Sequence, residues 1–86
     1  MTMHFEFEEA VGIEWARLAR RVAGEVFGRL DGDWSVRFFR IDKEALGVRV
    51  GHQGGKHVCR FDAGSVQESR VRGALVIAVA KLAPQE

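Results

Sequence analysis

A change of hydrophobic period near the N-terminus constrains the fold more than any other feature of the sequence. The segment His4–Glu8 alternates, with Phe5 and Phe7 on one side, which predicts a short half-buried strand. From about Glu9 the apolar residues recur at helical spacing and predict an amphipathic helix. We expect this helix to end at Asp31-Gly32-Asp33, because glycine readily adopts the left-handed conformation that closes a helix. Its apolar stripe comprises Val11, Trp15, Leu18, Ala19, Val22, Val26 and Leu30.

The rest of the chain predicts three strands and a second helix. The strands are expected at Trp34–Ile41, Ala45–His52 and Lys56–Asp62. The helix is expected to open with the capping box Ser65-Val66-Gln67-Glu68. Gly73 in its middle costs about 1 kcal/mol relative to alanine, which close packing against the sheet would explain. We therefore predict an α+β fold, a two-layer sandwich of β-α-β-β-β-α order with an antiparallel sheet and two helices on one face.

Length and composition favour one small globular domain over residues 1–86. The 9.6 kDa chain is 47% hydrophobic and 29% charged, and its thirteen basic and twelve acidic residues leave a net charge of +1. Such a balance excludes a strongly polyanionic or polycationic chain, whose net charge alone would indicate the partner. The longest apolar run, Ala74–Ala80, is far shorter than the ~20 residues of a membrane span. The acidic N-terminus lacks the pattern of a signal peptide, so we expect a cytoplasmic protein without membrane contact.

Turn residues set the expected register of the last two strands. A two-residue turn at Gly54-Gly55 pairs His52 with His57 and, farther along, Arg49 with Arg60. The apolar residues of both strands then share the opposite face. A slip of one residue would reverse the faces of a strand, which favours this register.

The preceding hairpin leaves two alternatives. A three-residue turn at Asp42-Lys43-Glu44 pairs Phe38 with Val48 and keeps Arg37 on the outer side of the sheet. A two-residue turn at Lys43-Glu44 would shift the pairing and turn Arg37 toward the core.

Side chains on the uncovered face of the sheet form the candidate binding surface. With the longer turn, Arg37, Arg49 and Arg60 lie in a row, one per strand, with Phe39 and Ile41 beside them. Like charges directly opposite one another are unfavourable, so the row indicates an anionic group on a partner. Arginine can hold such a group with two parallel hydrogen bonds. We interpret Arg37, Phe39, Arg49 and Arg60 as partner-binding residues.

Two further observations bear on this row. Gly47 and Gly51 flank Arg49, and their lack of side chains would let a partner's backbone approach closely. In the alternative interpretation, Glu6 and Glu8 on the first strand neutralise the arginines, which are then ordinary surface residues.

The first helix offers a second candidate surface. Ile13 and Phe27 lie off its core stripe, and an extra apolar strip on so small a chain is typical of a homodimer contact. The alternative is that Phe27 covers the edge of the core.

The chain supplies few groups for catalysis, and we expect no enzyme, no metal and no cofactor. His52, His57 and Cys59 gather at one end of a hairpin and could in principle supply metal ligands. No nearby carboxylate is placed to orient the imidazoles, and Cys59 lies in an apolar run, as a small hydrophobic residue would. A single cysteine also excludes an internal disulfide framework.

The order of helix, three strands and helix over roughly residues 10 to 83 is similar to that of the double-stranded-RNA-binding domain. That resemblance implies RNA contacts through helix ends and a loop, with a lysine cluster at the start of the last helix. The matching stretch here is Gln67-Glu68-Ser69-Arg70-Val71-Arg72, which holds two arginines and one glutamate. The resemblance therefore covers the order of elements and not the binding motif.

Two function classes fit these observations. An exposed surface of phenylalanine, isoleucine and arginine has the residue types that dominate protein interfaces, which predicts a small protein-binding module of adaptor or inhibitor type. Small phage-encoded inhibitors, anti-CRISPR proteins among them, are often single α+β domains of this size. The alternative is binding of RNA or single-stranded DNA by the same face, with Phe39 stacking on a base.

Overall fold

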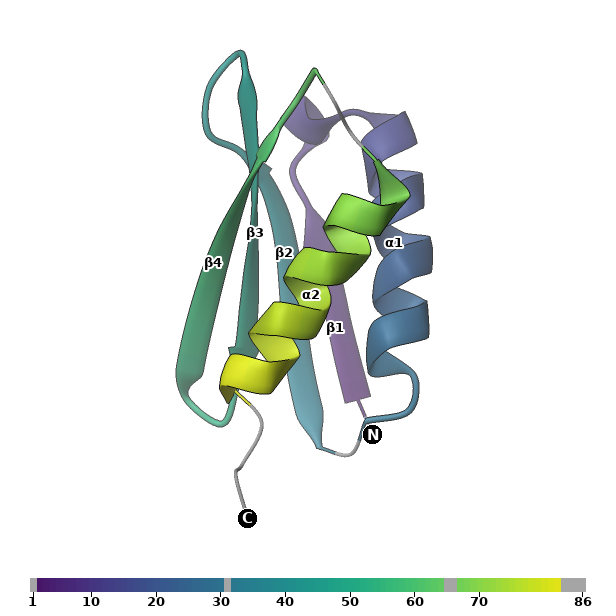
Figure 1. The fold of residues 1–86 in the computed structure, drawn as a ribbon, viewed down its shortest axis with the longest axis vertical. Coiled ribbons are helices and arrows are strands. Elements are labelled where there is room, and N and C mark those ends of the chain that lie inside the picture. The colour runs from purple at the N-terminus through teal and green to yellow at the C-terminus, as the bar shows by residue number, and fades with distance from the viewer. Residues whose placement is uncertain (1, 31, 65–66, 83–86) are drawn as a thin grey trace.

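The chain folds into a four-stranded sheet and two helices, seen in a computed structural model that describes residues 2–30, 32–64 and 67–82 (Figure 1). The predicted mixed α+β class is confirmed. The elements in chain order are β1 (Thr2–Phe7), a 3-10 turn (Glu9–Val11), α1 (Ile13–Phe27), β2 (Asp33–Arg40), β3 (Ala45–His52), β4 (Gly55–Asp62) and α2 (Glu68–Leu82).

The sheet is mixed, which corrects the expected antiparallel sheet. Its strand order is β1-β2-β3-β4, and β1 runs parallel to β2, with Phe5 beside Val36, while the other two pairs are antiparallel. The direction follows from α1, because a helix that crosses over between adjacent strands returns the chain to the same end of the sheet.

The β2–β3 register follows the three-residue turn, as the first of the two alternatives predicts. Phe38 lies opposite Val48 and Arg37 opposite Arg49, and the Ile41 N–H donates to the Ala45 carbonyl across the loop (3.0 Å). Arg37 is exposed on the outer side of the sheet.

The β3–β4 register differs from the expected one by two residues. The turn is Gln53-Gly54 rather than Gly54-Gly55, with φ of 49° at Gln53 and 83° at Gly54. Positive φ at both central residues is the geometry of the tight turn that suits twisted strands. Arg49 therefore faces Val58, and Arg60 faces Gly47. A shift of two residues leaves every side chain on its expected face.

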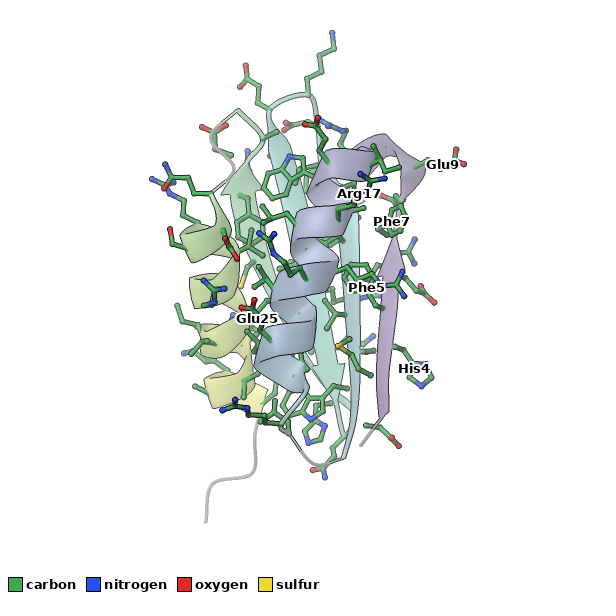
Figure 2. The ribbon with its side chains drawn as sticks, turned by 90° about the vertical axis from the view of Figure 1, so that its right-hand side faces the viewer. His4, Phe5, Phe7, Glu9, Arg17 and Glu25 are labelled. Atoms are coloured by element: carbon green, nitrogen blue, oxygen red, sulfur yellow. The ribbon has the colours of Figure 1, made fainter. Side chains whose placement is uncertain are left out.

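The core lies between the sheet and the two helices, which cover the same face of the sheet (Figures 1 and 2). Phe27 of α1 packs on Trp34, with ring centroids 5.4 Å apart. The fully buried larger side chains are Phe27, Phe38, Leu46, Leu75, Val11, Val22, Val36, Val48, Val50 and Val71. Among the described residues, no helix covers the other face of the sheet.

The first helix is shorter than expected. A 3-10 turn replaces the first residues of the long helix, and Gly12, with φ of 95°, separates that turn from α1. The helix ends at Phe27, before the predicted Asp31-Gly32-Asp33 segment, of which Asp31 lies outside the described residues. Two residues of the predicted capping box, Ser65 and Val66, also lie outside the described residues.

Charged side chains join the two helices on their solvent side. Arg21 of α1 lies 3.2 Å from a carboxylate oxygen of Glu68 on α2, and Arg72 hydrogen-bonds both Glu68 (3.1 Å) and Glu25. The Glu25 hydrogen bond, with the charges of both carboxylates, raises the pKa of Arg72 above its ordinary value. Among the described residues, neither helix is long and apolar enough to cross a membrane.

Candidate interaction face on the open side of the sheet

The outer face, which is the side of the sheet away from the helices, carries a mixed set of side chains in register. Arg37 and Arg49 lie opposite each other on β2 and β3, with Glu6 beside Arg37 and Val58 beside Arg49. The next row along the strands holds Phe39, Gly47 and Arg60. Val58 is 55% exposed and Ile41 44% exposed, so apolar and basic groups alternate on an open surface.

The Phe39 ring lies over the backbone of Gly47. A Cβ placed on Gly47 would come within 2.5 Å of the ring's Cζ, so an aromatic side chain fills the space that the glycine leaves. Gly51 is covered in the same way by the Ser35 hydroxyl, 2.6 Å from its ideal Cβ position. This corrects the expectation that the two glycines leave room for a partner's backbone. Gly47 instead accommodates the Phe39 ring, and Gly51 accommodates the Ser35 hydroxyl.

The three arginines do not form a straight row. Arg37 and Arg49 are directly opposite, but Arg60 is displaced by the two-residue shift and lies next to Gly47. Arg37 is 3.8 Å from Glu8, and Arg60 is 3.9 Å from Asp42. Glu8 is held in place because its other oxygen accepts the backbone N–H of Arg40 at 3.1 Å. In the described part of the chain, no ion pair involves Arg49, which is exposed.

A shallow hollow of about 440 Å³ lies in the outer face. It brings together Arg37, Phe39 and Arg49 from the predicted partner-binding set and leaves Arg60 outside. Its remaining lining residues are Glu8, Arg40 and Val58. A hollow of this size and shallowness suits a protruding side chain of a partner better than an enclosed small molecule.

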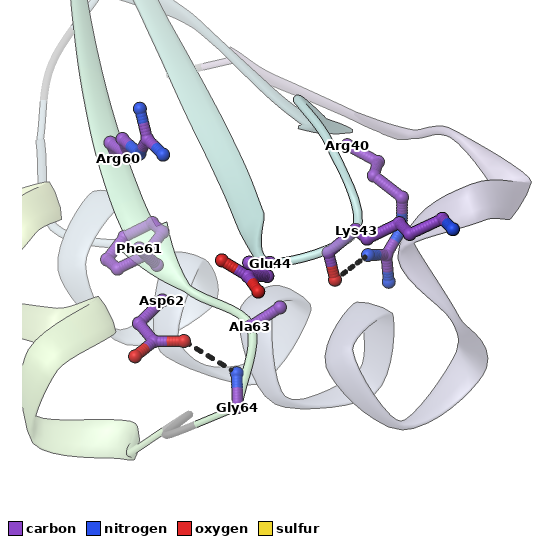
Figure 3. A pocket seen from close by; sticks show the side chains of 8 residues that line it. All are labelled: Arg40, Lys43, Glu44, Arg60, Phe61, Asp62, Ala63 and Gly64. Atoms are coloured by element: carbon purple, nitrogen blue, oxygen red, sulfur yellow. Dashed lines mark hydrogen bonds between the residues drawn. The ribbon is translucent and has the colours of Figure 1, made fainter.

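A larger hollow, about 910 Å³, opens at the end of the sheet where the β2–β3 loop meets the segment after β4 (Figure 3). Sequence reasoning missed Arg40, which organises this end. Its Nε donates to the Ala10 carbonyl (2.6 Å), and its Nη1 donates to the carbonyls of Asp42 (3.1 Å) and Lys43 (3.3 Å). Asp62 is likewise engaged, because its Oδ1 accepts the Gly64 N–H at 2.9 Å. Arg40 and Asp62 therefore hold the loops together at this end of the sheet.

His52, His57 and Cys59 do not converge. His52 is buried and stacks on Trp34, with ring centroids 3.8 Å apart and planes 3° apart, and its Nδ1 lies 2.8 Å from the Asp33 carbonyl oxygen. The Cys59 thiol is half-buried against α2, 3.8 Å from the Ala74 carbonyl, and this burial raises its pKa. Within residues 2–30, 32–64 and 67–82, no three His, Cys, Asp or Glu side chains gather so that they could hold a metal ion.

The two residues predicted as dimer contacts, Ile13 and Phe27, differ in burial. Phe27 has no exposed surface and belongs to the core, so it is not a dimer contact. The predicted stripe misplaced it because the buried face of α1 is rotated toward Ala23 and Phe27, while Trp15, Leu18 and Val26 of the predicted stripe are only half-buried. Ile13, at the first turn of α1, is 66% exposed and stays a candidate.

Comparisons with protein-family models, with curated protein sequences and with solved structures found no significant match for this chain.

Proposed function

We propose that this chain is a small non-catalytic protein-binding module whose partner docks on the outer face of the sheet. The observation that carries the proposal is the shared hollow of Arg37, Phe39 and Arg49 on a face that neither α1 nor α2 covers. An aromatic ring fixed on the sheet, next to guanidinium groups, has the composition of an interface centre. Val58 and Ile41 add exposed apolar surface around it.

The charges of the outer face support a protein as the partner. Arg37 has Glu8 within 4 Å and Arg60 has Asp42 within 4 Å, so two of the three basic groups already have acidic neighbours. The carboxylates of Glu8 and Asp42 would repel a polyanion such as a nucleic acid. Because proteins bind polyanions mainly by displacing counterions with basic groups, these carboxylates would lower the affinity. Arg49 suits one carboxylate of a partner, which it can hold with two parallel hydrogen bonds. Small adaptors and inhibitors, including phage-type inhibitors such as anti-CRISPR proteins, need a face of this kind and no catalytic group.

The test is a charge reversal at the centre of the face. Arg49→Glu should abolish partner binding and leave the thermal unfolding midpoint unchanged, because Arg49 is exposed and its charge would then repel the partner's carboxylate. Arg20→Glu on α1 is the matched control, since it makes the same charge change on the helical side of the molecule. Unchanged affinity in Arg49→Glu would refute the proposal.

Nucleic-acid binding is the second candidate, favoured by the half-exposed Phe39 ring that shares a hollow with Arg37 and Arg49. Such a ring can stack on a base while guanidinium groups contact phosphates. Fluorescence anisotropy with labelled single- and double-stranded RNA and DNA at about 50 and 200 mM salt separates the candidates. Tight binding that collapses with salt and is lost in Arg49→Glu would replace the protein partner with a nucleic acid.

A further inference from the structure

β1 forms an edge of the sheet (Figure 2), so alternate residues of its backbone have hydrogen-bonding groups that point away from β2. The Glu8 N–H donates to the Phe38 carbonyl of β2 at 3.0 Å. In a parallel pair the residues alternate, so the N–H and C=O groups of His4 and Glu6 also face β2. Those of Met3, Phe5 and Phe7 therefore face outward. An edge of this kind is a template for a further strand.

The two edges of the sheet are protected differently. The opposite edge strand, β4, carries Lys56 and Arg60, and α2 packs against it. β1 has the sequence TMHFEF, without lysine, arginine or proline, the residues that most often prevent edge pairing. Phe7 at its end is 46% exposed. The unprotected edge is therefore β1.

We propose that a second copy of this chain pairs antiparallel with β1, about a two-fold axis at Phe5. Phe5 then lies opposite Phe5 of the second copy, and Met3 lies opposite Phe7. These are the residues whose main-chain groups point outward, so each can exchange two hydrogen bonds with its partner across the axis. The two four-stranded sheets become one continuous sheet with all helices on the same face.

Complementary hydrogen-bonding side chains select this register. With the axis at Phe5, His4 of each copy lies opposite Glu6 of the other, so an imidazole N–H meets a carboxylate twice. Both side chains are exposed on the outer face, and they form a pair without main-chain hydrogen bonds, where side chains approach most closely. Moving the axis to Glu6 would oppose two carboxylates, and moving it to His4 would oppose two imidazoles. Only the central register is self-complementary.

The apolar side of β1 gains from the same arrangement. Met3, which is half-buried, would cover the exposed part of Phe7 of the other copy. A single short strand pair buries less than the ~800 Å² per partner of a standard interface, so we expect a micromolar dimer.

Sedimentation equilibrium of the full chain tests the association. We expect a monomer–dimer equilibrium between about 10 and 500 μM for the wild type. His4→Glu should weaken the dimer about tenfold, because it places two carboxylates opposite each other at two symmetric positions. His4→Lys is the matched variant at the same exposed position. It should dimerise at least as well as the wild type because its charge, unlike that of an edge lysine without a partner, lies opposite Glu6 of the other copy. A wild type that stays monomeric at about 500 μM, or equal dimerisation of His4→Glu and His4→Lys, would overturn the proposal.

Amide exchange followed by NMR locates the interface independently of any substitution. Exchange at Phe5 and Phe7 should slow as the protein concentration rises, since these amides are free at the edge of the monomer and bonded in the dimer. The amides of His4 and Glu6 face β2 and should be protected at every concentration. A dimer that leaves Phe5 and Phe7 exchanging at the monomer rate would assign the contact to another surface, with the exposed Ile13 as the next candidate, and would refute pairing through β1.

Discussion

Phe39 lies over Gly47 across the β2–β3 pair, closer than a Cβ on the glycine would allow. The ring is thereby fixed on the outer face, in the row next to Arg37 and Arg49. An aromatic side chain that rests on a strand glycine is a stable platform on an otherwise open sheet. The orientation of the Phe39 ring therefore depends on a glycine at position 47.

Gly47→Ala should therefore displace the Phe39 ring and cost about 1 kcal/mol of unfolding free energy, through lost contact of the ring with β3. Urea denaturation measures the cost, and a double-mutant cycle identifies its cause. In a Phe39→Ala background the same glycine substitution should cost nothing, because nothing remains for the methyl group to displace. Additive costs in the double mutant would show that the ring does not rest on the glycine.

For Gly73 in α2 we expect substitution by alanine to have the opposite effect on the unfolding free energy. A Cβ built there meets no atom within 4 Å, so close packing, the reason suggested by the sequence, does not account for this glycine. Gly73→Ala should raise the unfolding free energy by about 1 kcal/mol through helix propensity alone. A higher midpoint in thermal unfolding is the expected result, and a lower one would mean that the position is packed.

The Trp34–His52 stack closes the end of the core at the β3–β4 turn. His52→Ala should lose about 2 kcal/mol of unfolding free energy, because both the ring contact and the hydrogen bond to the Asp33 carbonyl disappear. His52→Phe keeps an aromatic ring without the hydrogen bond and should fall between the wild type and His52→Ala. Equal stability of His52→Phe and His52→Ala would show that the stack contributes nothing.

Cys59 should behave as a structural thiol. Burial raises its pKa, so the folded chain keeps the thiol protonated at a pH at which the unfolded chain has begun to ionise. Its contribution to the unfolding free energy is full below the unfolded thiol pKa, about 8.5, and is lost as the pH rises above it. The difference between the wild type and Cys59→Ala, measured by urea denaturation at about pH 7 and 9.5, should therefore shrink at the higher pH.

The same burial makes the thiol slow to react. Iodoacetamide at about pH 8 should modify folded Cys59 more slowly than the urea-unfolded chain, since the thiolate is the nucleophile. Equal rates would mean that the thiol is exposed and ionised as in a free chain.

The sequence allowed the alternating strands and the faces of their residues to be predicted, since a two-residue period is insensitive to distant contacts. The same period could not distinguish two β3–β4 registers that differ by two residues, because both leave Cys59 and Arg60 on their proper faces. Gly54-Gly55 looked like the better turn, yet Gln53 adopts a positive φ at the turn that forms.

Other features depend on contacts between residues far apart in the chain. Arg40 donates a hydrogen bond to the Ala10 carbonyl, thirty residues away in the chain, and no local sequence pattern predicts that bond. The parallel direction of β1 follows from how α1 packs, and alternation says nothing about strand direction. The candidate face was predictable through Arg37, Phe39 and Arg49, whereas the place of Arg60 depended on the turn that sequence reasoning misassigned.

The most direct test of the proposed binding face is capture from cells of the native host with three baits: the wild-type chain, Arg49→Glu and Arg20→Glu. Mass spectrometry would quantify the retained proteins. The account predicts a protein that the wild type and Arg20→Glu retain equally and that Arg49→Glu loses, because the outer face binds the partner and the helical side does not. Equal retention of every protein by all three baits would contradict it.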